Sequence, residues 1–353
     1  MWTNNTVYQG PLKEYHYPTD KEVGSLLVFL KKISTKHRVY LLDVPRWNLP
    51  LPPDNYDIYI ICMFGESVDT DYVKKLDQLP DYENKKIILL TSQFYKKPNF
   101  NRIKTFYIEH LHTVLPFLPK VEYTQISKRK FTHGVLSNRN AIHKTVLTVK
   151  LLNQFDKDLQ YSFCNTSSNE YRDPLQVIEV MSNLGINLGD ETRIIDFLQK
   201  LHQNPVVVPG HNWSIKNRIY QDSQLIWTAE SIFLSEDNDP TSYITEKLLK
   251  SIISGSPFVS VAQKNTLERL KLLGFETYEK EFGINYDNKA DRDRYISIFN
   301  LIDNFDLKQV LLSSTIQDLA NFNHNYFYTN FYKHVENNNT ELIDQMIEYV
   351  NAL

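Results

Sequence analysis

The feature that most constrains the fold of this chain is a repeated alternation of short apolar segments with amphipathic, more polar ones. The apolar segments are rich in β-branched and aromatic residues, which is typical of strands; they cover residues 38–44, 57–64, 85–92, 130–138, 158–165, 223–231 and 256–262. Segments with apolar residues at helical spacing lie between them, for example at 69–79 and 143–155. This alternation predicts an α/β fold with parallel sheets and helices on their faces.

A chain of 353 residues is longer than one core comfortably fills, so two domains are expected. The two series of strand-like segments predict two Rossmann-like domains that face each other. We place the first at 1–125 and the second at 126–305. Helical patterns over 306–353 predict terminal helices that pack across both domains.

Composition and motifs exclude several classes of protein. A net charge of −3 gives no global electrostatic case for a nucleic-acid partner. Two Cys residues far apart argue against a disulfide framework and fit a reducing compartment. No signal-peptide pattern opens the chain, and its apolar runs are too short to cross a bilayer. We therefore expect a cytoplasmic protein without a membrane span. Motifs of zinc hydrolases, P-loop NTPases and dinucleotide enzymes do not occur.

A charge pair at the start of an otherwise apolar helix suggests a binding site. In the segment SYITEKLLKSIISGSPFVSV, residues 242–261, Glu246 and Lys247 precede apolar helical residues, and Gly255 ends the helix before another strand. In an open α/β sheet, ligands bind at the carboxyl ends of strands, where helix N-termini present N–H groups. We therefore predict that Lys247 meets a phosphate and that Glu246 accepts hydrogen bonds from ribose hydroxyls.

A purely structural interpretation of the same residues stays open. Thr245 has the chemistry of an N-cap, and Glu246 in the first turn complements the helix dipole without any ligand. The spacing alone does not decide between the two interpretations.

The segment YITEKLLKSIISGSPFVSV resembles the donor-binding signature of the α-1,3-fucosyltransferases, approximately Y-x-T-E-K-L-x-x-A-x-x-x-G-x-V-P-V. Pro257 falls one place early, and Ser251 replaces the usual alanine. The positions that match in register are Tyr243, Thr245, Glu246, Lys247, Leu248 and Gly255.

Three further segments support the resemblance. KFTHGVLSNRNAIHKTVLTVKLL is similar to the strand–SN–helix element of the family: Ser137 and Asn138 fit, and the basic residue that touches the donor diphosphate would be Lys144 or His143. IILLTSQFYKKPNFN is a weaker match to the T-G-E-N segment of the family. Residues 272–287 resemble part of the glycosyltransferase-like proteins of large viruses and phages.

The resemblance implies the GT-B architecture, with the acceptor on the N-terminal domain, the nucleotide sugar on the second domain and the active site in the cleft between them. It implies that Glu246 holds the donor ribose and that Lys247 and Lys144 hold the diphosphate. Tyr243 would lie beside the donor, and Glu230 near the sugar. Transfer would invert the anomeric centre, and neither a metal nor another cofactor is expected.

The sequence departs from the family at the general base. Gln93 stands where the family has a glutamate, and an amide does not accept a proton at neutral pH. Glu66, directly after the segment 57–64, and the neighbouring Asp69 are the replacements that we predict as catalytic.

The leading hypothesis is an inverting glycosyltransferase that moves a sugar from a nucleotide sugar, GDP-fucose or a related GDP-sugar, to a hydroxyl of a glycan. One alternative is a phage or viral enzyme that glycosylates hydroxymethylated DNA bases, which requires extruding the base from the duplex. Another is a catalytically silent nucleotide-sugar-binding module, which the glutamine at position 93 motivates.

Overall fold

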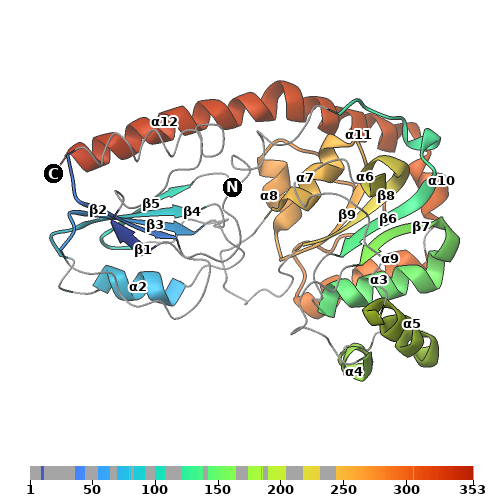
Figure 1. Cartoon of the computed structure of the whole chain (residues 1–353). Helices are drawn as coiled ribbons and strands as arrows, with labels where there is room; N and C mark the ends of the chain where they lie inside the picture. Colours follow the sequence, from blue (N-terminus) through green and yellow to red (C-terminus); the bar gives the residue numbers. More distant parts are fainter. Residues whose placement is uncertain are drawn as a thin grey trace. The chain divides into compact units, whose positions relative to one another are not determined.

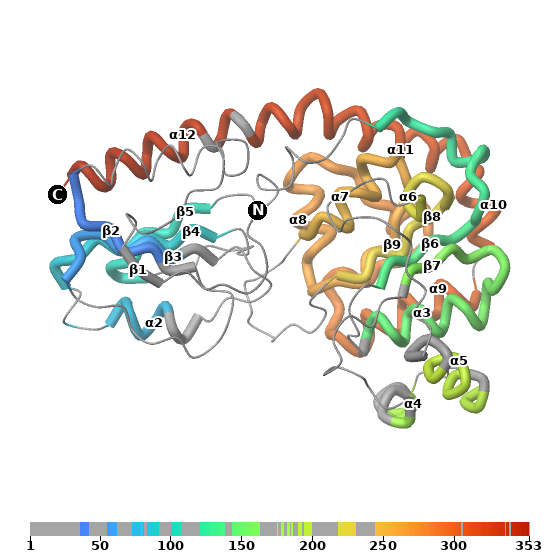
Figure 2. Tube along the Cα trace, in the orientation of Figure 1, coloured from blue at the N-terminus to red at the C-terminus, as the bar shows by residue number. Residues whose placement is uncertain are grey.

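The computed structural model divides into two compact units (Figures 1 and 2). Unit 1 comprises residues 1–117, 240–243 and 330–353, and unit 2 comprises residues 118–239 and 244–329. The structure describes residues 9–11, 36–43, 55–63, 70–78, 80, 83–91, 100–107, 121–137, 142–163, 174–183, 185, 190–203, 218–230, 244–304 and 306–352.

Unit 1 contains a five-stranded sheet in the order β1-β2-β3-β4-β5. All neighbouring strands are parallel except β1, which pairs antiparallel with β2. The predicted strands at 38–44, 57–64 and 85–92 are confirmed as β2, β3 and β4. The strands are β1 (Gln9–Pro11), β2 (Val39–Asp43), β3 (Ile58–Met63), β4 (Lys86–Thr91) and β5 (Ile103–Tyr107).

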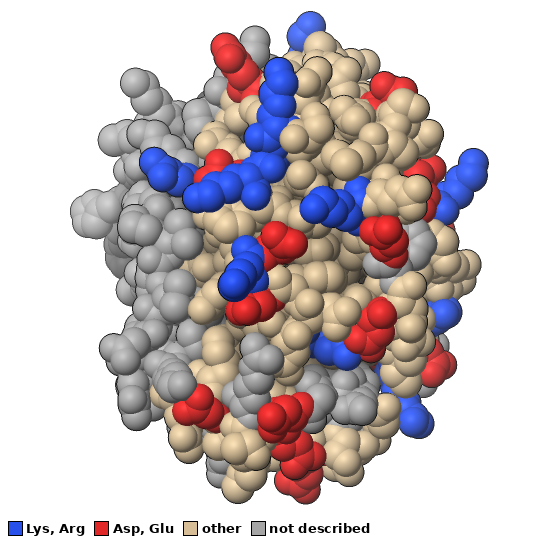
Figure 3. Space-filling view, turned by 90° about the vertical axis from the view of Figure 1, so that its right-hand side faces the viewer, with Lys and Arg blue, Asp and Glu red and all other residues tan. Residues whose placement is uncertain are grey.

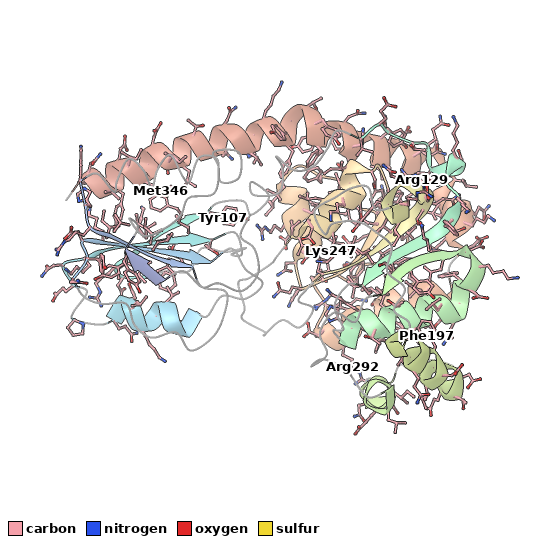
Figure 4. All side chains as sticks on the ribbon, in the orientation of Figure 1. Tyr107, Arg129, Phe197, Lys247, Arg292 and Met346 are labelled. Atoms are coloured by element: carbon pink, nitrogen blue, oxygen red, sulfur yellow. The ribbon has the colours of Figure 1, made fainter. Side chains whose placement is uncertain are left out.

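Each face of this sheet packs against one helix, as Figure 1 shows. Alternate side chains of a strand point to opposite faces, so Leu41 belongs to the core beneath α12 (Tyr332–Asn351), whereas its neighbour Tyr40 packs on the side of α2 (Thr70–Gln78). Met346 of α12, labelled in Figure 4, is fully buried in the first of these cores. Because both faces are covered, the strands are almost continuously apolar, as buried parallel strands are.

Unit 2 contains a four-stranded parallel sheet in the order β7-β6-β8-β9. The strands predicted at 130–138, 158–165, 223–231 and 256–262 are confirmed. They are β6 (Phe131–Ser137), β7 (Leu159–Phe163), β8 (Ser223–Ala229) and β9 (Phe258–Val261). The α/β class with parallel sheets is therefore confirmed in both units.

The remaining helices of unit 2 surround its sheet (Figure 1). The described helices are α3 (Ile142–Phe155), α4 (Pro174–Asn183), α5 (Glu191–Gln203), α6 (Arg218–Asp222), α7 (Glu246–Ile253), α8 (Thr266–Leu272), α9 (Asp291–Asn304), α10 (Leu307–Leu311) and α11 (Ser314–Tyr326), with short 3-10 turns at Ile126–Lys128 and Asp156–Asp158 and a π-helical segment at Phe327–Phe331.

The strand order of unit 2 creates a switch point between β6 and β8. The chain leaves β6 through α3 toward β7 on one side, and leaves β8 through α7 toward β9 on the other. Crossover connections are right-handed, so α3 and α7 lie on opposite faces of the sheet, as Figure 1 shows. The carboxyl ends of strands at such a point form the usual ligand crevice of an open α/β sheet.

Local capping divides one helical stretch that the sequence shows as continuous. The apolar pattern over 307–322 separates into α10 and α11 because Ser313 accepts a hydrogen bond at 3.4 Å from the backbone N–H of Ile316 and starts a new helix. Two further segments fit the patterns described above, 21–34 as a helix and 204–210 as a strand, and both lie outside the described residues. Among the described helices, none is long and apolar enough to cross a membrane.

Candidate functional site

The candidate site lies in unit 2 at the carboxyl edge of its sheet, where β6 and β8 diverge. Four segments meet there: the end of β6, the start of α3, the residue after β8 and the start of α7. These segments carry the predicted site residues Ser137, His143, Lys144, Glu230, Thr245, Glu246 and Lys247. The hydrogen bonds described below tie these segments into one cluster.

Glu230 stands at the centre of the cluster. Its backbone N–H donates to the Val261 carbonyl at 3.0 Å, which continues the pairing of β8 with β9. Its own carbonyl lies 2.8 Å from His143 Nε2, and since a carbonyl only accepts, the imidazole carries its proton on Nε2. The Glu230 side chain is only 1% exposed, and burial raises its pKa, while Lys247 is the strongest influence that lowers it.

Thr245 connects this carboxyl to the start of α7. Its extended backbone and side chain form the N-cap that the sequence predicts, accepting a hydrogen bond from the Lys247 N–H at 3.2 Å. The Lys247 ammonium lies 3.4 Å from the same hydroxyl. The hydroxyl in turn donates to Glu230 Oε2. The N-cap and the buried carboxyl therefore belong to one hydrogen-bond network.

The ion pair of Glu246 and Lys247 at the N-terminus of α7 is largely buried. Lys247 Nζ lies 3.4 Å from Glu246 Oε1, and the two side chains are only 12% and 18% exposed. Figure 4 labels Lys247 on α7. An exposed ion pair contributes little, but screening by water and salt is weaker at this degree of burial.

The start of α3 forms the opposite side of the cluster. The Lys144 side chain is 1% exposed, and its ammonium, like that of Lys247, lowers the pKa of Glu230. Thr148 donates its hydroxyl proton to the Lys144 carbonyl at 2.8 Å, so Ser137, 2.9 Å away, donates to Thr148. The Ser137 hydroxyl is therefore directed into α3. Burial lowers the pKa of His143 to about 4, so the imidazole is neutral at pH 7.

Two residues of the cluster were not predicted. Lys250 is only 2% exposed, and burial lowers its pKa to about 8, against the opposing effect of Glu246 one turn earlier. Tyr220 of α6 is buried, and burial raises the pKa of its phenol, with Glu246 and Glu230 adding to the effect. A lysine in a helix normally marks the solvent side. Here that side of α7 is buried as well. At the end of the helix, His324 of α11 contacts the Ile253 carbonyl at 2.7 Å.

The far end of α7 is fixed by a buried arginine. The Arg129 guanidinium, labelled in Figure 4, donates to the carbonyls of Ser254 at 2.6 Å and Gly255 at 3.0 Å. It also donates to the Ser223 carbonyl at 3.0 Å. Burial lowers its pKa to about 10. Gly255 has φ +63°, and a Cβ there would collide with the Tyr123 ring, so glycine is required. Anchoring this end sets the direction in which the N-terminus of α7 points.

Several predicted residues lie outside the described part of the chain: Glu66, Asp69, Gln93, Asn138 and Tyr243. Among the residues that are described, no group of three or more His, Cys, Asp and Glu side chains is placed to hold a metal ion. The face of the molecule in Figure 3 carries Lys, Arg, Asp and Glu scattered over it, without a broad area of one sign.

The chemistry of the cluster suits an anion that also carries hydroxyl groups. A helix N-terminus and two sheltered ammonium groups, those of Lys144 and Lys247, provide positive potential. The carboxyl groups of Glu230 and Glu246 provide sites for hydroxyls. Comparisons of the sequence and structure with protein-family models, curated proteins and solved structures found no match.

Proposed function

We propose that this crevice binds the nucleoside diphosphate part of a nucleotide sugar and that the protein is an inverting glycosyltransferase. The observation that carries the proposal is the convergence, at the switch point of the sheet, of the α7 N-terminus with Lys144, Lys247 and the buried Glu230. Parallel α/β sheets bind phosphorylated ligands at such points.

The resemblance to the fucosyltransferase signature supports the proposal from a second direction. Its most specific part, Thr245-Glu246-Lys247, begins α7, and Thr245 is hydrogen-bonded to Glu230. The position of the switch point follows from strand order alone and does not depend on the motif. In the proposed complex Lys247 and Lys144 hold the diphosphate, Glu246 accepts hydrogen bonds from the ribose, and GDP-fucose or a related GDP-sugar is the donor.

The proposed reaction is a single displacement at the anomeric carbon. A hydroxyl oxygen of a glycan attacks this carbon from the face opposite the diphosphate, the bond from carbon to phosphate oxygen breaks, and the nucleoside diphosphate leaves with the electron pair. The proton of the hydroxyl passes to a general base, for which Glu66 and Asp69 are the candidates. The ammonium groups of Lys144 and Lys247 stabilise the charge that develops on the leaving group.

Incubation of the full chain with labelled GDP- and UDP-sugars tests the proposal. We expect one nucleotide sugar to be hydrolysed slowly and, with a suitable glycan, to give a product whose anomeric configuration, read by NMR, is inverted. Lys247→Ala should lower kcat/KM by about 10- to 100-fold, the loss of one charge-assisted contact. Lys271→Ala is the control, since that side chain is 52% exposed and forms a salt bridge with Glu279 at 3.1 Å.

Two results would count against the proposal in different ways. Binding of a nucleotide sugar without transfer or hydrolysis would leave a nucleotide-sugar-binding module without catalysis. Absence of both binding and turnover with every donor would remove the glycosyltransferase assignment.

A further inference from the structure

Among the described residues, the proton of the Thr245 hydroxyl has one acceptor. Lys247 approaches the hydroxyl oxygen with two groups that can only donate, its backbone N–H at 3.2 Å and its ammonium at 3.4 Å. The hydroxyl has a single proton, and Glu230 Oε2 is the acceptor within reach. Oε2 is therefore the accepting oxygen of the carboxyl. When the carboxyl is neutral, its own proton belongs on the other oxygen, Oε1.

Oε1 is buried from solvent, and it has no hydrogen-bond partner in the part of the chain that the structure describes. Buried polar atoms in folded proteins are almost always hydrogen-bonded, and an exception calls for a missing partner. The atom lies on a residue that joins β8 to the N-terminus of α7, inside the cluster described above. A bound ligand is the partner that this position can receive.

We propose that Glu230 contacts the donor as a neutral carboxyl, with its proton on Oε1 and donated to a phosphate oxygen. The inference rests on the proposed function, because it assigns a role within the same site. It identifies a specificity-determining contact: a carboxyl that donates bonds more strongly to an anionic oxygen than to a neutral hydroxyl, and it disfavours a group that can only donate.

The charges around Glu230 agree with this state. From α7, Glu246 raises the pKa of Glu230 and Lys247 lowers it; from α3, Lys144 also lowers it, and the neighbouring His143 is neutral. Tyr220 of α6 is a neutral phenol. Burial outweighs the two lysines and keeps the pKa of Glu230 above its ordinary value.

A bound diphosphate would strengthen the preference for the neutral form. It brings negative charge toward the carboxyl and engages the two ammonium groups that favour the ionised form. The carboxyl therefore takes up a proton on binding wherever it is ionised in the free protein. By linkage, the affinity of the wild-type protein falls as pH rises above the pKa of Glu230 in the free protein, by up to about tenfold per pH unit.

Glu230→Gln tests the direction of this hydrogen bond. Its amide keeps a carbonyl oxygen for the Thr245 hydroxyl and places an N–H where the Oε1 proton would be, so it imitates the neutral acid at every pH. The control is Glu279→Gln on the surface, where Glu279 pairs with Lys271 at 3.1 Å. Isothermal titration calorimetry with GDP, UDP and inorganic diphosphate between pH 6 and pH 9 gives the affinities. Buffers of different ionisation enthalpy give the number of protons taken up.

We expect Glu230→Gln to bind with an affinity within about threefold of the highest wild-type value. Titration of the phosphate makes binding depend on pH in every variant. Wild type and Glu279→Gln should show a further pH dependence of the affinity, which Glu230→Gln should lack. Wild type should take up as much as one proton more than Glu230→Gln as the pH rises. A loss of affinity of about tenfold or more in a folded Glu230→Gln protein would contradict the proposal, since it would mean that a carboxylate accepts a hydrogen bond from the donor.

The number of protons that the wild-type protein takes up on binding tests the role of Glu230 even if the variant does not fold. Binding of a nucleotide without proton uptake beyond that of the free nucleotide, at a pH where the carboxyl is ionised, overturns the role of Glu230 and leaves the proposed function intact. Failure of every nucleotide and of diphosphate to bind the wild-type protein overturns both.

Discussion

Each unit of the molecule buries a carboxyl group, and the two groups differ in how completely they are hydrogen-bonded. In unit 1, Asp77 of α2 is 6% exposed and accepts three backbone N–H groups, from Asn101 at 2.8 Å, Arg102 at 2.7 Å and Ile103 at 3.1 Å. Both of its oxygens are used, and they hold α2 against the start of β5. In unit 2, Glu230 has one oxygen bonded to Thr245 and the other without a partner among the described residues.

Asp77 is a structural carboxyl, whereas our proposal is that a ligand completes the hydrogen bonding of Glu230. Burial of a charge is costly and is repaid when hydrogen bonds satisfy it fully. Asp287, also in unit 2, belongs with Asp77: it accepts from the N–H groups of Leu267 at 3.0 Å and Glu268 at 2.9 Å at the start of α8. Burial alone therefore does not mark a site; among the described carboxyl groups, Glu230 is the one that has a buried oxygen without a hydrogen-bond partner.

The two units also differ in how many polar side chains they bury. Among the described residues of unit 1, the buried polar side chains are Asp77 and Thr91. Unit 2 buries many more, and several carry charge: Arg129, Lys144, Glu230, Lys250, Arg269, Asp287 and Arg294. Apolar packing makes up most of the described core of unit 1, whereas unit 2 also buries a set of charged and hydrogen-bonded side chains.

The largest expected effect is a loss of stability of unit 2 in acid. His133 of β6 is 2% exposed, accepts from Trp227 Nε1 at 3.3 Å and has its pKa lowered to about 3 by burial. The unfolded chain binds the proton near pH 6.5, so stability falls as pH decreases from about 6.5 toward 3, by up to about 5 kcal/mol. Hydrogen exchange at pH 7 and pH 4 should show opening in β6 and β8 before β3 and β4. His133→Phe should flatten this acid dependence, and an unchanged acid slope would contradict the assignment.

Asp77→Asn should produce the next largest effect. The asparagine NH₂ would face a backbone N–H, so one oxygen contact becomes a clash of two donors, and we expect a loss of about 2–3 kcal/mol in the free energy of unfolding. Urea denaturation measures the loss, and hydrogen exchange should place it at the start of β5. A variant as stable as wild type would show that the three N–H contacts of Asp77 do not hold α2 against β5.

Lys144→Met should weaken nucleotide binding by about tenfold, or about 1.4 kcal/mol, through the loss of a buried ammonium. The methionine fills a similar volume, and because Lys144 acts on the pKa of the buried Glu230, urea denaturation of the variant is needed to separate a loss of affinity from a loss of stability. Calorimetric titration measures the affinity, with Lys308→Met on the exposed side of α10 as the control. Equal affinities of the two variants would exclude Lys144 from the site.

Glu230→Gln should have the smallest effect on stability, and in the opposite direction to Asp77→Asn. The amide keeps the acceptor for Thr245 and removes a buried group that titrates, so the free energy of unfolding at pH 8 should rise by less than about 1 kcal/mol. Denaturation of both amide variants under one set of conditions checks the contrast. Destabilisation of the two by similar amounts would abolish the distinction drawn between these carboxyls.

The sequence predicts most of the strands because each buried parallel strand is a continuous apolar segment. It does not predict β5, in which Ile103 and Phe106 are buried and the polar Lys104 and Thr105 between them interrupt the apolar run. The sequence does not predict the strand order either. The connection from β7 to β8 passes over β6, and no local pattern records that crossing.

The start of α7 could be located from sequence because capping is local: Thr245 and the two charges after it follow one another along the chain. The Glu230–Thr245 hydrogen bond spans 15 residues and requires the folded sheet. The burial of Lys250 depends on the packing of other elements around α7, which the helical pattern does not record.

The most direct test of the nucleotide site is a thermal-shift titration of GDP, UDP, ADP and CDP against wild type, Lys247→Ala and Lys271→Ala. A ligand at 100 times its Kd stabilises the folded state by about 2.7 kcal/mol. We predict that one nucleotide raises the Tm of wild type and of Lys271→Ala, and that Lys247→Ala loses most of the shift. If no nucleotide raises the Tm, or if Lys247→Ala responds as wild type does, the charge pair is a helix cap and the crevice is not a nucleotide site.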